Sequence, residues 1–157
     1  MNNRVLIAIL ATLVVIIQVQ LLGAWPVLGA QPHLIALGAV LFCALERFEL
    51  GLVWILVGSL FVDSLLSARF GVTTMPLLIV YGSTTVLLRR YVHDVPIWGY
   101  ALLAIIFVGF TELPLTIGSQ FDGWQLVRDA FVGALLILPL AVFATHQTST
   151  RRAGLRI

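Results

Sequence analysis

The sequence predicts an all-α integral membrane protein, and three observations support this prediction. Hydrophobic residues make up 61% of the 157 residues and charged residues only 10%, whereas roughly 25% of the residues of soluble domains are charged. Long apolar runs follow one another along almost the whole chain. The longest polar stretch, residues 146–157, is too short to form a soluble domain, so we expect a single transmembrane domain over residues 1–157.

Six apolar segments predict six transmembrane helices. A helix needs about 20 apolar residues, with a range of about 17–25, to cross the hydrocarbon core of a bilayer. The segments are residues 5–22, 33–45, 50–66, 73–88, 97–117 and 126–145.

Each segment has its own signals. The first, 5–22, is longer than the apolar region of a signal peptide, which has about 7–15 residues, so we expect an uncleaved membrane helix. Pro32 stands before the second segment at a position suited to a helix start. This segment is short, and it either borrows residues from both flanks or does not span fully. The third and fifth are apolar runs with one carboxylate each. Thr73 or Thr74 is the expected N-cap of the fourth, and Pro139 is expected to bend the sixth.

The placement of the arginines predicts the orientation. Cytoplasmic loops of membrane proteins carry an excess of basic residues. With six spans and both termini in the cytoplasm, the seven inner arginines are Arg4, Arg47, Arg89, Arg90, Arg151, Arg152 and Arg156, and the two outer ones are Arg69 and Arg128.

Polar residues inside the apolar segments form one predicted layer near the outer surface. Asp63 lies near the end of the third segment with Ser59 on the same helix face, and Glu112 lies in the last third of the fifth. Arg69 and Arg128 follow just beyond, on the outer side. Intramembrane acids are functional candidates because they are costly in lipid. Two interpretations stay open: a polar cleft or docking surface open to the outside, or hydrogen bonding between helices that fixes their packing.

Other functional classes have no support in the sequence. His33, His93 and His146 lie at different levels or sides, which argues against a shared metal site. Cys43 is the single cysteine, so an intramolecular disulfide is excluded. The basic residues are dispersed and leave no footprint for nucleic-acid binding. No catalytic set and no phosphate-binding glycine loop is visible, so we expect a protein that is not an enzyme and has no cofactor.

Two charged turns are expected on the cytoplasmic side. Glu46, Arg47 and Glu49 predict a solvated turn, and Arg89 and Arg90 are expected to meet anionic lipid headgroups. A contact with a cytoplasmic partner is the alternative at either turn.

Motifs in the second to fourth segments resemble those of the rod shape-determining protein MreD family. The run Gln31-Pro32-His33-Leu34-Ile35 opens a short helix, and Gly51 and Gly58 follow in the third segment. That segment ends in Asp63-Ser64-Leu65-Leu66, and Gly71 begins the next turn. The resemblance covers residues 31–90 by motif and the rest of the chain by hydropathy.

The resemblance implies a non-enzymatic component of the bacterial cell-wall elongation machinery in the inner membrane. It implies a fold similar to the substrate-binding subunits of energy-coupling-factor transporters. The partner would be an MreC-like single-pass membrane protein, with peptidoglycan synthases and an MreB-type filament engaged indirectly. The positions that match the family are Pro32, Gly51, Gly58, Asp63 and Gly71; Glu112 is inferred from depth and spacing alone.

A substrate-binding membrane subunit of a small-solute, vitamin-type transporter is the alternative function. The polar outer layer would then form a solute pocket. The first helix would dock a coupling subunit through small residues such as Ala8 and Thr12.

Overall fold

Helices account for nearly all of the part of the chain that the structure describes. The computed structural model describes residues 3–22, 33–65, 71–91, 95–116 and 123–154, and no strand occurs among them. The elements are α1 (Asn3–Ile17), a π-helical turn η1 (Gln18–Leu22), α2 (Leu34–Ala44), α3 (Phe48–Leu65), α4 (Thr74–Tyr91), α5 (Ile97–Thr116) and α6 (Gly123–Gly154). The predicted all-α class is confirmed for these residues.

Among the described residues, three helices are long and apolar enough to cross a membrane. These stretches are Asn3–Gln20, Phe48–Leu65 and Gly123–His146. Leu34–Ala44 and Trp98–Thr111 are shorter apolar helices. α4 belongs to neither group, since its last turn carries Arg89 and Arg90. These helices, with their many exposed leucines, isoleucines and phenylalanines, are those of a membrane protein, because a soluble surface rarely exposes large apolar patches.

The first and sixth segments differ most from the sequence-based prediction. The first segment ends in a π-helical turn, Gln18–Leu22, instead of a continuous α-helix. α6 continues past the predicted end at residue 145 to Gly154, and Pro139 lies inside it without ending it. Hydropathy marks where a chain leaves the apolar region, but a helix can continue into water for as long as its backbone hydrogen bonds do.

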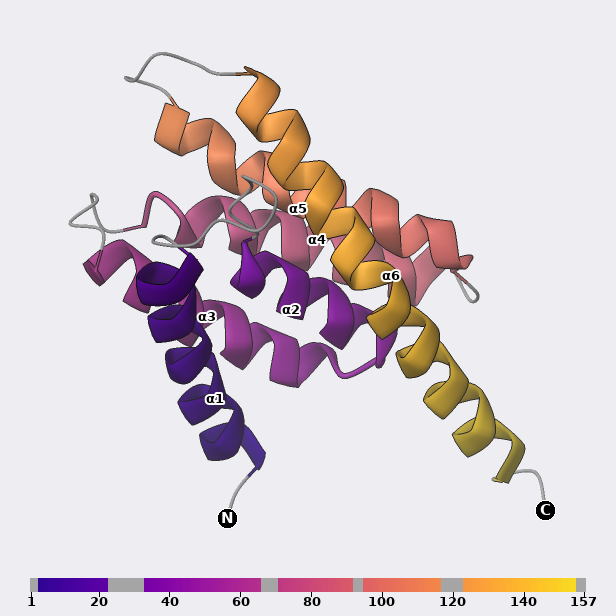
Figure 1. Ribbon diagram of the computed structural model, residues 1–157. Coiled ribbons are helices and arrows are strands. Elements are labelled where there is room, and N and C mark those ends of the chain that lie inside the picture. Colours follow the sequence, from indigo (N-terminus) through magenta and orange to yellow (C-terminus); the bar gives the residue numbers. More distant parts are fainter. Residues whose placement is uncertain (1–2, 23–32, 66–70, 92–94, 117–122, 155–157) are drawn as a thin grey trace.

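The short helix α2 is the centre of the bundle. It contacts α1, α3, α4, α5 and α6, and Figure 1 shows it lying between α3 and α6. Most of its residues are buried, among them the small residues Ala36, Ala39 and Ala44. Small residues let helix backbones approach closely. Its 11 residues extend only roughly 17 Å, so α2 is a helix enclosed by protein along most of its length.

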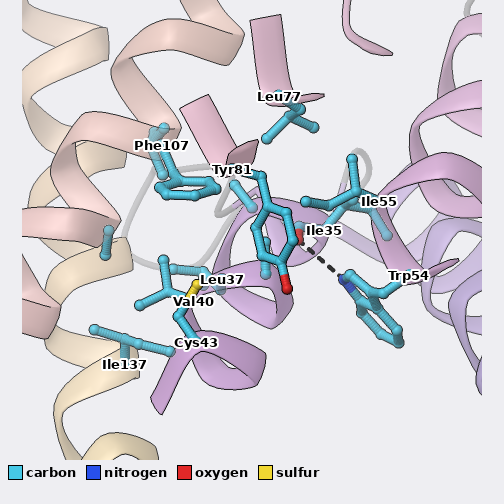
Figure 2. Packing of buried hydrophobic residues seen from close by; sticks show 14 of the residues in the cluster. Ile35, Leu37, Val40, Cys43, Trp54, Ile55, Leu77, Tyr81, Phe107 and Ile137 are labelled. Carbon is cyan, nitrogen blue, oxygen red and sulfur yellow. Dashed lines mark hydrogen bonds between the residues drawn. The ribbon is translucent and has the colours of Figure 1, made fainter. Parts of the chain in front are cut away.

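Tyr81 of α4 lies in the middle of the core. Figure 2 shows its ring among Leu77, Ile55 and Phe107, and the Phe107 ring meets it edge to face with centroids 6.4 Å apart. Nearby, the indole of Trp54 donates to the backbone carbonyl of Ile35 at 3.0 Å. Buried aromatic residues with a polar atom usually find such a partner, and here the bonds join neighbouring helices.

Candidate functional site

The Asp63 carboxylate caps the beginning of α4. It is fully buried, and its Oδ2 accepts from the backbone N–H of Gly71 at 3.0 Å and of Thr74 at 3.3 Å. The Thr74 hydroxyl donates to the same oxygen at 2.7 Å, and the Thr73 N–H donates to Oδ1 at 3.0 Å. The first N–H groups of a helix have no partner within the helix and favour a negative charge. The carboxylate of α3 therefore holds the N-terminus of α4.

The turn before α4 is shaped to deliver these donors. Gly71 has a φ of +92°, a conformation that residues with a Cβ rarely adopt. This φ directs its N–H to Asp63. The backbone conformation therefore favours a glycine at position 71, although a Cβ there would have room, with its nearest neighbour, Cγ of Met75, 3.7 Å away.

His33 forms a second cap beside Asp63. Its Nδ1 accepts from the Ala36 N–H at 3.4 Å at the start of α2, and its ring interacts electrostatically with the Asp63 carboxylate. Ser59 is buried one turn away and donates to the Ile55 carbonyl at 2.6 Å. We call these buried polar residues the cap cluster; its members are His33, Ser59, Asp63, Thr73 and Thr74.

The glycines of the third segment lie where side chains of other helices approach. A Cβ at Gly58 would lie 2.6 Å from Cδ1 of Ile35 in α2, closer than such atoms pack. A Cβ at Gly51 would meet the Tyr81 hydroxyl and Phe42. Both glycines therefore permit α3 to approach its neighbours.

No described contact joins the remaining predicted site residues to the cap cluster. Arg128 is partly buried in α6, and its Nε has no hydrogen-bond partner among the described residues. Glu112 lies in α5, but its side chain is outside the described part of the chain. Pro32 and Arg69 also lie outside the described residues. The described hydrogen-bond donors to Asp63 are thus backbone N–H groups and a hydroxyl, and Arg128 is not among them.

Three buried polar residues have roles or positions that the sequence did not predict. His33 was named in the run that opens the second segment and was rejected as a metal ligand, but its capping role was not predicted. Tyr81 was not singled out, and neither was Asp129, which is buried in α6. The Tyr81 hydroxyl donates to the Phe48 carbonyl at 2.8 Å and joins α4 to α3. A tyrosine in the middle of an apolar run was the available signal, because its hydroxyl needs a partner there.

A charged cavity lies at the opposite end of α3 and α4. It has a volume of about 300 Å³ and is lined by Glu46, Arg47, Phe48, Glu49, Leu50 and Arg89. Arg4 of α1 donates to Glu49 at 3.0 Å. The Arg89 guanidinium lies 4.8 Å from the centroid of the Phe48 ring. We call this end of the bundle the Arg89 end and the other the Asp63 end.

No protein-family model, curated protein or solved structure matches the chain. The contacts of its residues therefore carry the functional argument. Within the described residues no group of His, Cys, Asp or Glu could hold a metal ion. An ionised carboxylate has about four acceptor sites, and four donors occupy those of Asp63. Its described contacts therefore bind α3 to the start of α4, and three of the four donors converge on one carboxylate oxygen.

Proposed function

We propose that the chain is a non-enzymatic membrane scaffold of the bacterial cell-wall elongation machinery, similar to MreD. In this proposal six helices cross the inner membrane in a fold like that of energy-coupling-factor substrate-binding subunits. Both termini are cytoplasmic, and the Asp63 end faces outward. The scaffold binds an MreC-like single-pass protein and thereby maintains rod shape.

The observation that carries the proposal is the cap formed by Asp63 and Gly71. Residues that carry the family resemblance contact one another. Gly71 donates to Asp63, and Gly58 adjoins Ile35 of the run that opens the second segment. The shared motif is thus a set of contacts that holds α2, α3 and α4 together. A motif of this kind favours a scaffold, whose function is to present a fixed surface.

The same observation weakens the transporter alternative. A solute pocket needs polar groups that converge on a cavity and remain free to bind. Asp63 has its acceptors occupied, and Ser59 donates within its own helix. Glu112 is the remaining polar contact that we predict for the MreC-like helix at the Asp63 end.

Co-purification tests the proposal. The tagged chain, expressed with an MreC-like protein, should recover a stable complex, and its depletion from a rod-shaped host should make the cells round. Glu112→Gln should weaken the complex. Glu49→Gln makes the same chemical change at the Arg89 end and should leave the complex intact.

Two outcomes would replace the proposal with the transporter alternative. The first is a vitamin-like small molecule that stays tightly bound to the purified chain. The second is co-purification of a coupling subunit in place of any cell-wall protein.

A further inference from the structure

The charged cavity at the Arg89 end has a rigid backbone. α2 ends in a Schellman motif, in which the N–H of Arg47 donates to the Phe42 carbonyl at 3.0 Å and that of Glu46 to the Cys43 carbonyl at 3.1 Å. At the start of α3, the hydroxyl of Tyr81 donates a hydrogen bond to the carbonyl of Phe48. Because this backbone is already fixed, a ligand that binds here pays little conformational entropy to order it, and this preorganisation favours affinity.

The cavity wall is strained at one residue. Glu46 has a φ of +56°, at the position of the Schellman motif that is usually glycine. A residue with a side chain costs roughly 1–2 kcal/mol in this conformation. Non-glycine residues in strained conformations cluster at sites of binding, and the Glu46 side chain lines the cavity.

Both signs of charge line the cavity. Arg47 and Arg89 supply guanidinium groups, and Glu46 and Glu49 supply carboxylates. Arg89 has five N–H donors, so its position over the Phe48 ring leaves donors for a ligand. Glu49 already accepts one hydrogen bond from Arg4, and its remaining acceptor sites can bind a further donor. A simple anion would be attracted by the arginines but repelled by the carboxylates. A ligand that carries a phosphate and an ammonium group matches both.

The cavity lies at the end of α3, a helix long and apolar enough to cross a membrane, and the ends of membrane-spanning helices lie at the level of the lipid headgroups. It is formed at the end of α3 and α4, and Leu52 and Leu87, close by along these helices, are exposed. Acyl chains of a lipid could lie along such residues while its headgroup enters the cavity. A volume of about 300 Å³ is at the small end of ligand pockets and suits a headgroup better than a peptide.

We propose that this cavity binds the headgroup of phosphatidylethanolamine. Arg47 and Arg89 hold the phosphate, and Glu46 and Glu49 accept hydrogen bonds from the ammonium group. The inference is independent of the scaffold function and of the orientation of the chain, because both membrane surfaces carry headgroups.

Lipid retention tests the proposal. The full chain, purified in a mild detergent, is incubated with equal amounts of phosphatidylethanolamine, phosphatidylglycerol and phosphatidylcholine with identical acyl chains. Native mass spectrometry then counts the bound lipid. Phosphatidylethanolamine should be retained best, since phosphatidylglycerol lacks the ammonium group and the ammonium of phosphatidylcholine has no N–H.

Matched variants assign the retention to the cavity. Arg89→Gln should lower retention of phosphatidylethanolamine about twofold to fivefold, as expected for the loss of one exposed charged contact. Arg90→Gln changes the neighbouring arginine, which does not line the cavity, and should have no effect. Glu46→Gln keeps the strained backbone and should reduce the preference for phosphatidylethanolamine over phosphatidylglycerol.

Three results would overturn the proposal. One is equal retention of the three lipids, and another is the same effect of Arg89→Gln and Arg90→Gln. The third is displacement of the lipid by soluble phosphoethanolamine at equal concentration, which would assign the cavity to a free phosphate compound.

Discussion

The Asp63 carboxylate interacts with the ends of three helices. It extends from α3, caps α4 through the donors of residues 71–74, and interacts with His33 at the start of α2. Unsatisfied N–H groups are costly where water is excluded. The cap therefore fixes the relative positions of helix ends that the hydrophobic effect alone would leave free to slide in lipid.

We expect Asp63→Asn to destabilise the chain by about 1–3 kcal/mol, because the amide oxygen can replace Oδ2 but the amide nitrogen then faces the Thr73 N–H, which loses its acceptor. Asp63→Ala should cost more, since all four donors lose their partner. Ser64→Ala is the control, because the Ser64 hydroxyl is exposed and donates only within its own helix. Unfolding in detergent measures the effect, and a variant Asp63→Asn as stable as the wild type would show that the cap contributes nothing.

Part of this site could be predicted from the sequence. A carboxylate near the end of an apolar segment can be located by hydropathy, and Thr73 or Thr74 was predicted as the N-cap of the fourth segment because threonine is a helix-capping residue. The hydrogen-bond partners of Asp63 could not be predicted. Backbone N–H groups occur at every position and have no sequence signature, whereas the arginines that seemed suitable partners are conspicuous.

At the scale of elements, α2 differs most from a simple membrane span. Its short length was visible in the sequence as an apolar segment below the usual minimum. Its central position was not, because a helix surrounded by other helices and one surrounded by lipid have equally apolar residues. Backbone at membrane depth needs no full span where protein covers it.

The contact between α2 and α3 depends on Gly58. We expect Gly58→Leu to destabilise the chain by about 1–3 kcal/mol or to lower its folded yield, because Ile35 occupies the space that the side chain needs. Gly82→Leu is the matched control: Gly82 is exposed in α4, and a Cβ there meets no atom within 4 Å. Size-exclusion chromatography and thermal unfolding compare the two, and equal behaviour would contradict the packing role.

The end of α2 allows a stabilising substitution. Glu46→Gly should raise the free energy of unfolding by about 0.5–1 kcal/mol, because glycine relieves the strain at φ +56° while losing more entropy on folding. Glu46→Ala removes the same carboxylate but keeps the Cβ, so it should give no such gain. If the two variants have the same Tm, the backbone at residue 46 is not strained.

At the scale of the whole molecule, the helix bundle has two ends, the Arg89 end and the Asp63 end. Arg4, Glu49 and Arg89 lie together at one end, as the salt bridge between α1 and α3 and the cavity demonstrate. The sequence-based orientation assigned these residues to the same side from arginine counts alone. Arginine counts can predict which loops share a side of the membrane, because basic residues accumulate in the loops of one side. They do not predict which of those residues touch.

The proposed orientation predicts the accessibility of single cysteines. In a Cys43→Ala background, Arg90→Cys should be protected from a membrane-impermeant thiol reagent added to intact cells. Trp124→Cys, at a residue that is 75% exposed near the start of α6, should react. Both should react after the membrane is permeabilised, and labelling of position 90 in intact cells would reverse the orientation.

The central position of α2 has a consequence for biosynthesis. α2 is synthesised before α5 and α6, although both form part of its surroundings. Until they arrive, a helix of roughly 17 Å stands in a hydrocarbon layer about 30 Å thick, accompanied mainly by α3 through the tight turn between them. We expect nascent chains that stop after α4 to be removed by membrane proteases faster than complete chains, as pulse-chase labelling would measure. The last helix to be made would thus complete the enclosure of one of the first.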